Sequence, residues 1–206
     1  MVALNSDLIE EITDKIDLTE EPDKDWKILQ VSQNGIFLGD IVKGSEATQA
    51  HKLVKAGDIV YNPYRINIGS VGVVPPHLDG AVASPAYVVI RSKNALYPPS
   101  YIVSILKHPR YMRVIMNYSI SSARASLPFS ELVRIKIPKQ TDKDLAMLKK
   151  LEKELSQQLT RKNEIVREIS NFAANSLEDE DTNPNHLEDF NQVLKRAVLS
   201  SKPRRT

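Results

Sequence analysis

Cysteine is absent from the 206 residues, and no long hydrophobic run occurs. Without cysteine the chain can form no disulfide framework, no thiolate zinc site and no cysteine nucleophile. The longest nearly apolar run, around residues 81–90, is far shorter than the roughly 20 residues that a transmembrane helix needs. The acids near the N-terminus do not suit a signal peptide. The sequence therefore predicts a soluble protein of the cytoplasm.

Glycine is also scarce, with seven residues, and this argues against one tempting function. Adenine amino-methyltransferases hold the exocyclic amine of a flipped-out base with an Asn-Pro-Pro-Tyr/Phe loop, and this chain contains Asn62-Pro63-Tyr64. The cofactor of such enzymes needs a glycine-rich turn after a strand, yet no Gly-x-Gly pair occurs; the loop also needs a second proline, whereas here Arg65 follows Tyr64. We therefore predict a strand-ending turn, because Pro63 fixes φ and Asn62 suits the start of a turn.

Other catalytic and metal-binding patterns are missing as well. The four histidines are scattered without the spacing of metal ligands, and no phosphate-binding P-loop or Gly-x-Ser-x-Gly elbow occurs. The sequence predicts no catalytic residue, no metal site and no cofactor bound by this chain.

Acids are few in the middle of the chain. Residues 24–139 carry fifteen bases and six acids, a net charge of +9, whereas residues 1–23 come to −7. A compact domain at +9 attracts a polyanion, because each Lys or Arg that neutralises a phosphate releases counterions. The alternative is a basic surface that is merely solvated.

The apolar pattern divides the chain into four parts and predicts an α+β fold. Residues 1–23 form an acidic N-terminal segment, for which Ser6 as an N-cap and apolar residues on one side predict a short helix up to Ile16. Residues 24–139 form a mostly β domain, because short runs rich in Val, Ile and Tyr alternate with Gly and Pro. One short helix is expected within that domain, over residues 99–108.

The third part, residues 140–173, is predicted to be one long helix. It lacks Gly and Pro and begins with Thr141-Asp-Lys-Asp144, which has the shape of a capping box. An apolar seam at alternating three- and four-residue spacing predicts that this helix packs on another helix as a coiled coil. Its members are Leu148, Leu151, Leu155, Ile165 and Ile169. The seam could instead shift to Leu159 where Gln158 interrupts it. The last part, residues 174–206, is expected to be a tail with a possible short helix over residues 186–199.

Two groups of polar residues in the basic domain are candidates for contacting DNA. Arg can bond guanine through two atoms, Asn can do the same for adenine, and Ser serves phosphates. Loop residues that could read bases are Arg65, Asn67, Ser122 and Arg124. A row that could face phosphates, at the end of the predicted short helix, consists of Lys107, Arg110 and Arg113. These bases equally suit a helix C-terminus, where cations are stabilised.

Four blocks in a fixed order resemble the target recognition domain of type I restriction-modification DNA specificity subunits. Trp26 also stands where that domain usually begins. The resemblance covers about residues 24–172, and the blocks are Lys55-Ala-Gly-Asp-Ile-Val-Tyr-Asn62, Asn67-Ile-Gly-Ser-Val-Gly-Val-Val-Pro75, Asp79-Gly-Ala-Val-Ala-Ser-Pro-Ala-Tyr-Val-Val-Ile90 and Arg124-Ala-Ser-Leu-Pro-Phe-Ser-Glu-Leu-Val-Arg-Ile-Lys-Ile-Pro138.

The resemblance implies a non-catalytic protein of a prokaryotic cytoplasm. Family members read double-stranded DNA, and each recognition domain reads half of a split target. Long helices separate two such domains and dock the adenine methyltransferase subunit, which carries S-adenosylmethionine; the restriction subunit is a further possible partner. This chain has one domain and one helix, which implies a half-subunit. The resemblance also implies that two copies form a homodimer through residues 142–172, as an antiparallel coiled coil, and read a palindromic split target.

Three alternatives stay open from the sequence. The chain could be the recognition domain of a fused adenine methyltransferase and restriction enzyme, with residues 1–23 as a remnant of the fusion. It could be a self-contained adenine methyltransferase, against which the missing glycine-rich turn counts. It could also be a helical scaffold whose basic domain binds another acidic partner.

Overall fold

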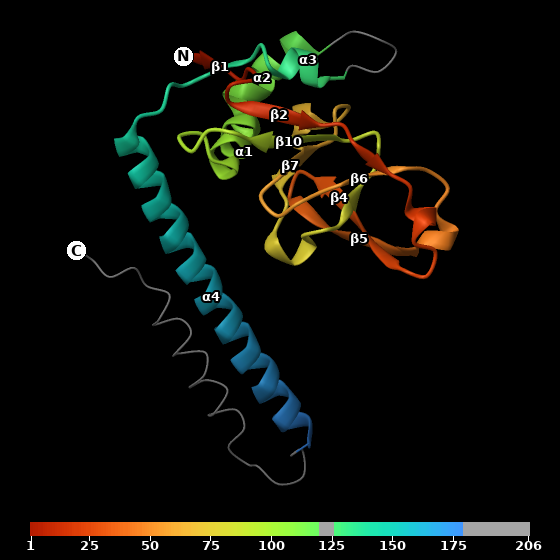
Figure 1. Ribbon diagram of the computed structural model, residues 1–206. Helices are drawn as coiled ribbons and strands as arrows, with labels where there is room; N and C mark the ends of the chain where they lie inside the picture. Colours follow the sequence, from red (N-terminus) through yellow and green to blue (C-terminus); the bar gives the residue numbers. More distant parts are fainter. Residues whose placement is uncertain (120–125, 179–206) are drawn as a thin grey trace, which may run out of the picture. The chain divides into compact units, whose positions relative to one another are not determined.

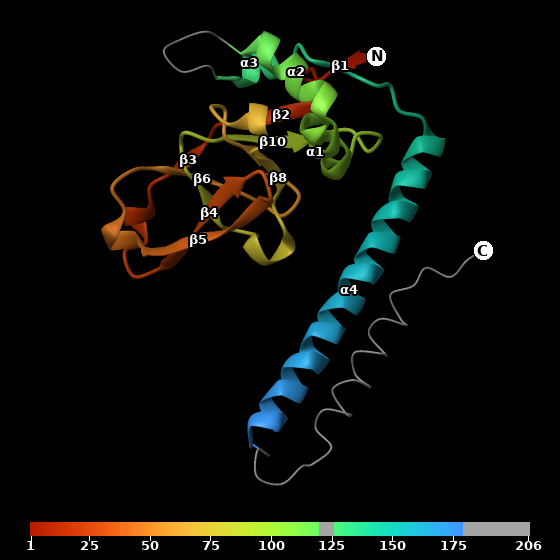
Figure 2. The same cartoon turned by 180° about the vertical axis from the view of Figure 1, so that it is seen from behind.

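The computed structural model describes residues 1–119 and 126–178 (Figures 1 and 2). The chain divides into two compact units, Met1–Leu145 and Ala146–Thr206. The first unit combines sheets with short helices and the second contains most of a long helix, so the predicted α+β class is confirmed.

A four-stranded antiparallel sheet forms the centre of the first unit, with the strand order β2-β10-β7-β8. Its strands are β2 (Ile9–Ile12), β7 (Ile59–Tyr61), β8 (Val71–Val73) and β10 (Val88–Ser92). The short strands β1 (Val2–Ala3) and β11 (Lys136–Ile137) form a separate antiparallel pair.

A second sheet has five strands in the order β3-β6-β9-β4-β5, and only β4 and β9 pair in parallel. Its strands are β3 (Lys15–Ile16), β4 (Asp25–Ser32), β5 (Gly35–Lys43), β6 (His51–Leu53) and β9 (Val82–Ala83). The two sheets approach closely where β8 meets β5, since a Cβ placed on Gly72 would lie 2.9 Å from Ile36 Cγ1. Glycine is therefore required at that contact.

Three helices lie wholly within the described residues of the first unit, and two of them pack on the four-stranded sheet. They are α1 (Pro99–Lys107), α2 (Pro109–Tyr118) and α3 (Phe129–Leu132), with single turns η1 (Leu18–Glu20), η2 (Gly44–Glu46), η3 (Ile66–Ile68) and η4 (Pro76–Leu78) elsewhere. The largest apolar core joins Ile102, Leu106 and Ile115 of α1 and α2 to Ile59, Tyr61 and Ile90 of the sheet. Both views place α1 and α2 at the side of the unit away from η2 (Figures 1 and 2).

The predicted N-terminal helix is wrong, because the residues up to Ile16 form strands β2 and β3. Ile9 is fully buried, and Glu10 and Glu11 stand opposite Arg91 and Ile90 in the antiparallel pairing with β10. Burial of the apolar side chains and the hydrogen bonds of the ladder outweigh a local helical preference, which is worth only tenths of a kcal/mol per residue.

The expected short helix is confirmed as α1, but a second helix, α2, was not predicted. Pro109 disfavours the helical conformation at the preceding residue, so His108 is extended, with φ −68° and ψ 133°. Pro109 then starts α2, and His108 Nδ1 accepts a hydrogen bond from the Arg110 backbone N–H at 3.2 Å. One residue thus ends α1 and caps α2.

The long helix is confirmed as α4 (Asp142–Glu178), and its first turn carries the predicted capping box. The Thr141 N–H and hydroxyl donate to Asp144 Oδ2 at 3.0 and 2.7 Å, and the Asp144 N–H donates to Thr141 Oγ1 at 3.3 Å. Among the helices of the described residues, none is both long and apolar enough to cross a membrane. The possible helix over residues 186–199 lies outside the described residues.

Candidate nucleic-acid interface

The Asn62-Pro63-Tyr64 segment forms the predicted turn at the end of β7. Asn62 Oδ1 accepts a hydrogen bond from the Tyr64 N–H at 3.0 Å, and the Asn62 carbonyl accepts one from the Arg65 N–H at 3.0 Å. The amide oxygen of Asn62 is therefore used to fold the turn. This geometry turns the chain into η3 and places Arg65 at its start.

The same turn is tied to the chain on the far side of the segment 120–125. The Leu127 N–H donates to the Pro63 carbonyl at 3.0 Å, and the buried Tyr61 hydroxyl donates to the Leu127 carbonyl at 3.1 Å. Burial raises the pKa of Tyr61 far above its ordinary value, so the hydroxyl keeps its proton and its role as donor. These bonds tie the turn and the end of β7 to Leu127.

A left-handed glycine seats η3 against α2. Gly69 ends η3 with φ +84° and ψ 19°, a conformation that other residues rarely adopt. A Cβ at this position would also lie 3.2 Å from Met112 Cε of α2. Glycine therefore sets both the direction of the loop and its close approach to the helix.

The predicted row of Lys107, Arg110 and Arg113 does not lie on one helix. Lys107 ends α1, whereas Arg110 and Arg113 lie in α2 beyond the break at His108. The two arginines are exposed on α2, whose buried side carries Tyr111. Their spacing of three residues keeps them on neighbouring positions of the helix surface.

Lys107 has a different role from the two arginines. Its Nζ donates to the Gln33 carbonyl, in the turn between β4 and β5, at 3.1 Å. Partial burial lowers the pKa of Lys107 from its usual value. The side chain thus ties the end of α1 to the second sheet and is less free to reach a ligand.

The surface formed by η3 and α2 is basic and almost free of acids. The segments that form it, residues 65–69 and 109–119, contain three bases and no acid. Arg65, Arg110 and Arg113 are exposed, and no ion pair joins them to another described residue. We refer to η3 together with the exposed side of α2 as the η3–α2 surface.

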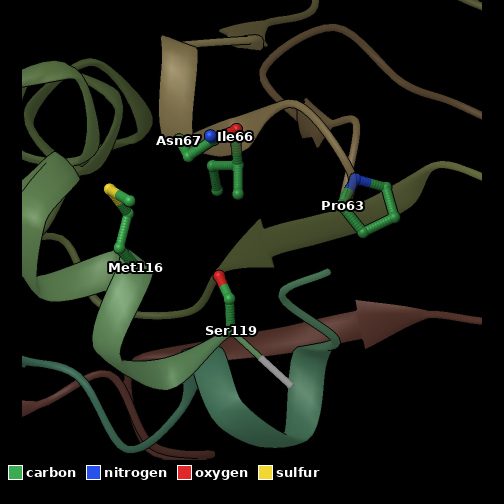
Figure 3. A pocket seen from close by; sticks show the side chains of 5 residues that line it. All are labelled: Pro63, Ile66, Asn67, Met116 and Ser119. Atoms are coloured by element: carbon green, nitrogen blue, oxygen red, sulfur yellow. The ribbon is translucent and has the colours of Figure 1, made fainter. Parts of the chain in front are cut away.

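A small pocket opens on the η3–α2 surface (Figure 3). It is lined by Pro63, Ile66, Asn67, Met116 and Ser119, with a volume of about 70 Å³. Figure 3 shows these side chains around one hollow, with those from the 63–67 segment opposite those from α2 and its end. Sequence reasoning nominated Asn67 but not Met116, because a methionine in a helix usually indicates core packing.

An ion pair between the buried Asp58 and the half-buried Arg91 links strand β10 to the chain just before β7. The Asp58 carboxylate accepts from Arg91 Nε and Nη2 at 2.8 and 2.9 Å and from the Lys55 N–H at 2.8 Å. The hydrogen bond to Asp58 is the main cause that raises the pKa of Arg91. Because Arg91 is paired with Asp58, we count it as a structural residue of the domain and not as a candidate for contacting DNA.

Two predicted site residues, Ser122 and Arg124, lie outside the described residues. Of the other five, Arg65 directly precedes η3, Asn67 lies in η3, Arg110 and Arg113 lie on α2, and Lys107 ends α1. Within residues 1–119 and 126–178, no group of three or more His, Asp or Glu side chains could hold a metal ion.

Comparisons with known proteins bear on the fold. No protein-family model matches the chain, and no curated protein matches its sequence. Among solved structures, the HsdS subunit from Thermoanaerobacter tengcongensis is similar with a TM-score of 0.60 and 16% identity, over 84% of this chain and 46% of that one. A chain from a structural study of complex assembly and conformational transition in the type I R-M system gives 0.62 and 15%, again over 84% and 46%.

The chain has the fold of an HsdS specificity subunit. It spans about half the length of the two subunits that it matches. The expected target recognition domain followed by a long helix is thus found as an arrangement of the backbone. At 15–16% identity the likeness to HsdS concerns this arrangement and leaves the function to be argued from the residues of the η3–α2 surface.

Proposed function

We propose that the chain is a non-catalytic DNA-specificity component of a type I restriction-modification system. The observation that carries this proposal is the η3–α2 surface, which presents the exposed Arg65, Arg110 and Arg113 on segments that contain no acid. Such a surface attracts the phosphates of double-stranded DNA, and the HsdS-like fold is consistent with that use.

Contacts with DNA divide between positioning and reading. Arg110 and Arg113, exposed on α2, suit phosphates, because they can neutralise charge without a fixed orientation. Asn67 lies in η3 and Arg65 directly precedes it, and both side chains have groups that can bond the edges of bases. Ser122 and Arg124 remain candidate readers. Lys107, tied to the Gln33 carbonyl, mainly positions α1.

A second copy of the chain is proposed to pair along α4. This helix has 37 residues, about 55 Å at 1.5 Å per residue, and carries exposed apolar side chains. Leu151 is 48% exposed, Leu155 66% and Leu159 55%, whereas Leu148, Ile165 and Ile169 are half-buried. An isolated helix of this kind is stabilised by packing its apolar side against another helix.

Antiparallel pairing would place two recognition domains at opposite ends of a helical spacer. Each copy would then read half of a split target, and the target would be palindromic because the copies are identical. The methylation itself would belong to a partner adenine methyltransferase subunit, which binds S-adenosylmethionine. In this chain Asn62 holds a turn through its own amide oxygen, which suits a structural role.

Methylation mapping tests this proposal. DNA is incubated with a type I adenine methyltransferase subunit and S-adenosylmethionine, with and without the purified chain, and methylated adenines are located by sequencing. We expect methylation only with the chain present, at sites that share a split palindrome. Methylation by the chain alone would show a self-contained enzyme. A chain that stays monomeric in light scattering and recruits no subunit would favour the fragment of a fused enzyme instead.

A further inference from the structure

We propose that the pocket between η3 and α2 reads a single A·T base pair from the major groove. Asn67 would bond the adenine, and Met116 with Ile66 would take the C5-methyl group of the thymine. This inference rests on the proposed DNA-reading function and names the base pair that this part of the surface recognises.

The polar group of the pocket is free to pair. Asn67 is exposed, and its side-chain amide makes no hydrogen bond to any other described residue. An amide offers one acceptor and a pair of donors, which match the N6 amine and N7 of adenine. The Ser119 hydroxyl donates its one proton to the Ile115 carbonyl at 3.0 Å. With that bond formed, the hydroxyl oxygen can only accept a hydrogen bond from a ligand in the pocket. An acceptor there suits the amine of adenine and disfavours O6 of guanine.

The rest of the pocket is apolar. Ile66, 1% exposed, and Pro63 belong to the turn, and Met116, 61% exposed, contributes its flexible thioether from α2. An exposed methionine beside arginines is unusual on a surface that binds only phosphate, because the thioether gains nothing from a charged oxygen. Apolar side chains are the ones that contact the thymine methyl group in the major groove.

The pocket is large enough for a methyl group. Its volume of about 70 Å³ exceeds the roughly 10–15 Å³ that is needed to hold one water molecule. A base that stays stacked in the duplex and is approached from its edge can therefore place its methyl group there.

An A·T pair presents the required groups in one row. Across the major groove it shows N7 and the N6 amine of adenine, then O4 and the methyl group of thymine. A G·C pair lacks the methyl group, and it shows O6 of guanine in place of the amine. One polar and one apolar side chain on opposite walls are the minimum needed to tell these pairs apart.

The walls are held in place before any ligand arrives. Gly69 seats η3 on Met112 of α2, and the Asn62 turn fixes the other end of the loop. A reader that is already ordered loses little conformational entropy on binding, and its geometry discriminates more sharply.

Selection from a pool of random duplexes, using the full chain, tests the inference. Wild type is expected to enrich a motif in which one position requires A·T. Asn67→Ala should weaken the preference for A·T over the other base pairs by about fivefold or more at that position, and at no other position of the motif. Asn67→Asp should shift the preference toward C·G, because a carboxylate accepts from the cytosine N4 amine. Both variants change an exposed side chain, and thermal unfolding checks that the fold is kept.

The methyl contact is tested on the selected duplex with deoxyuridine in place of that thymidine. Wild type should bind the uracil duplex about fourfold more weakly, the loss expected for one buried methyl-sized group. Met116→Ala should bind both duplexes equally, while the matched control Met147→Ala, 55% exposed on α4, should behave as wild type.

The outcomes distinguish the A·T assignment from the proposed DNA-reading function on which it rests. If wild type enriches no motif, the proposed sequence-reading function fails. If it enriches a motif that neither variant of Asn67 changes, and uracil is tolerated, DNA reading stands and the A·T assignment is overturned.

Discussion

Salt dependence of DNA binding measures how many phosphates the η3–α2 surface contacts. Arg110 and Arg113 are exposed on α2 and make no ion pair with another described residue, so each can neutralise one phosphate. Each such contact contributes about −0.9 to the slope of log Kobs against log salt concentration. We expect the double variant Arg110→Ala/Arg113→Ala to lower the magnitude of the slope by about 1.8.

The slope converts into a simple ratio of affinities. A threefold rise in salt weakens binding by about 2.7-fold for each phosphate contact, or about sevenfold for two. The advantage of wild type over the double variant should therefore shrink about sevenfold over that range. Fluorescence anisotropy with a labelled duplex, titrated at several salt concentrations, gives both slopes.

Two controls make this measurement specific. Arg113→Lys keeps the charge and should keep the slope. Lys43→Ala removes an exposed base at the end of β5. Lys43 is eight residues, or about 25 Å, along this strand from Gly35, the end of β5 that lies next to β8. Figures 1 and 2 place the adjoining η2 on the side of the unit away from α1 and α2. The reasoning is refuted if Lys43→Ala changes the slope as much as the α2 variants do, or if the double variant leaves it unchanged.

Three further predictions concern pairing, the scaffold and the start of α4. Leu155→Asp should abolish self-association in light scattering, because a charge would enter the apolar side of α4. Arg91→Met should lower the free energy of unfolding in urea by about 3 kcal/mol, since it leaves the carboxylate of Asp58 buried without its partner. Hydrogen bonds from the Thr141 hydroxyl and, second, from the Thr141 N–H lower the pKa of Asp144. The stability that this cap contributes is therefore fully present above pH 3.8, the ordinary pKa, and is lost as the pH falls through the lowered pKa. The amide resonance of Thr141 in NMR should report this loss.

Each of these predictions has a control. Gln157→Asp adds the same charge at an exposed α4 position off the predicted seam and should leave self-association intact; equal loss in both variants would point to helix destabilisation in general. Adding Asp58→Asn to Arg91→Met should recover part of the lost stability, and no recovery would mean that the buried charge is not the cause. Asp144→Asn should remove the pH response at Thr141, and a response that persists would assign it to another group.

The long helix was predictable because its signals are local. A run without Gly or Pro and a capping box at Thr141 and Asp144 act within a few residues of the positions they determine. The break at Pro109 was also present in the sequence, since a proline restrains the residue before it, and that signal would have separated Lys107 from Arg110.

Other features depend on contacts between distant residues. The spacing of Ile9 and Ile12 suits one side of a helix as well as a strand, and the choice is made by pairing with β10, about 80 residues further on. The pocket likewise exists only because Gly69 brings η3 onto Met112 of α2. Residue types such as Asn67 can be nominated from sequence, but their neighbours, here Met116, follow from tertiary packing.

Selection of bound sequences from a random pool of duplexes, with the wild-type chain at moderate salt, tests the central claim most directly. The account predicts an enriched motif of two inverted half-sites separated by a fixed spacer. Binding without any enriched sequence, with an affinity that does not change between low and moderate salt, would contradict it and indicate a basic domain that binds an acidic partner other than DNA.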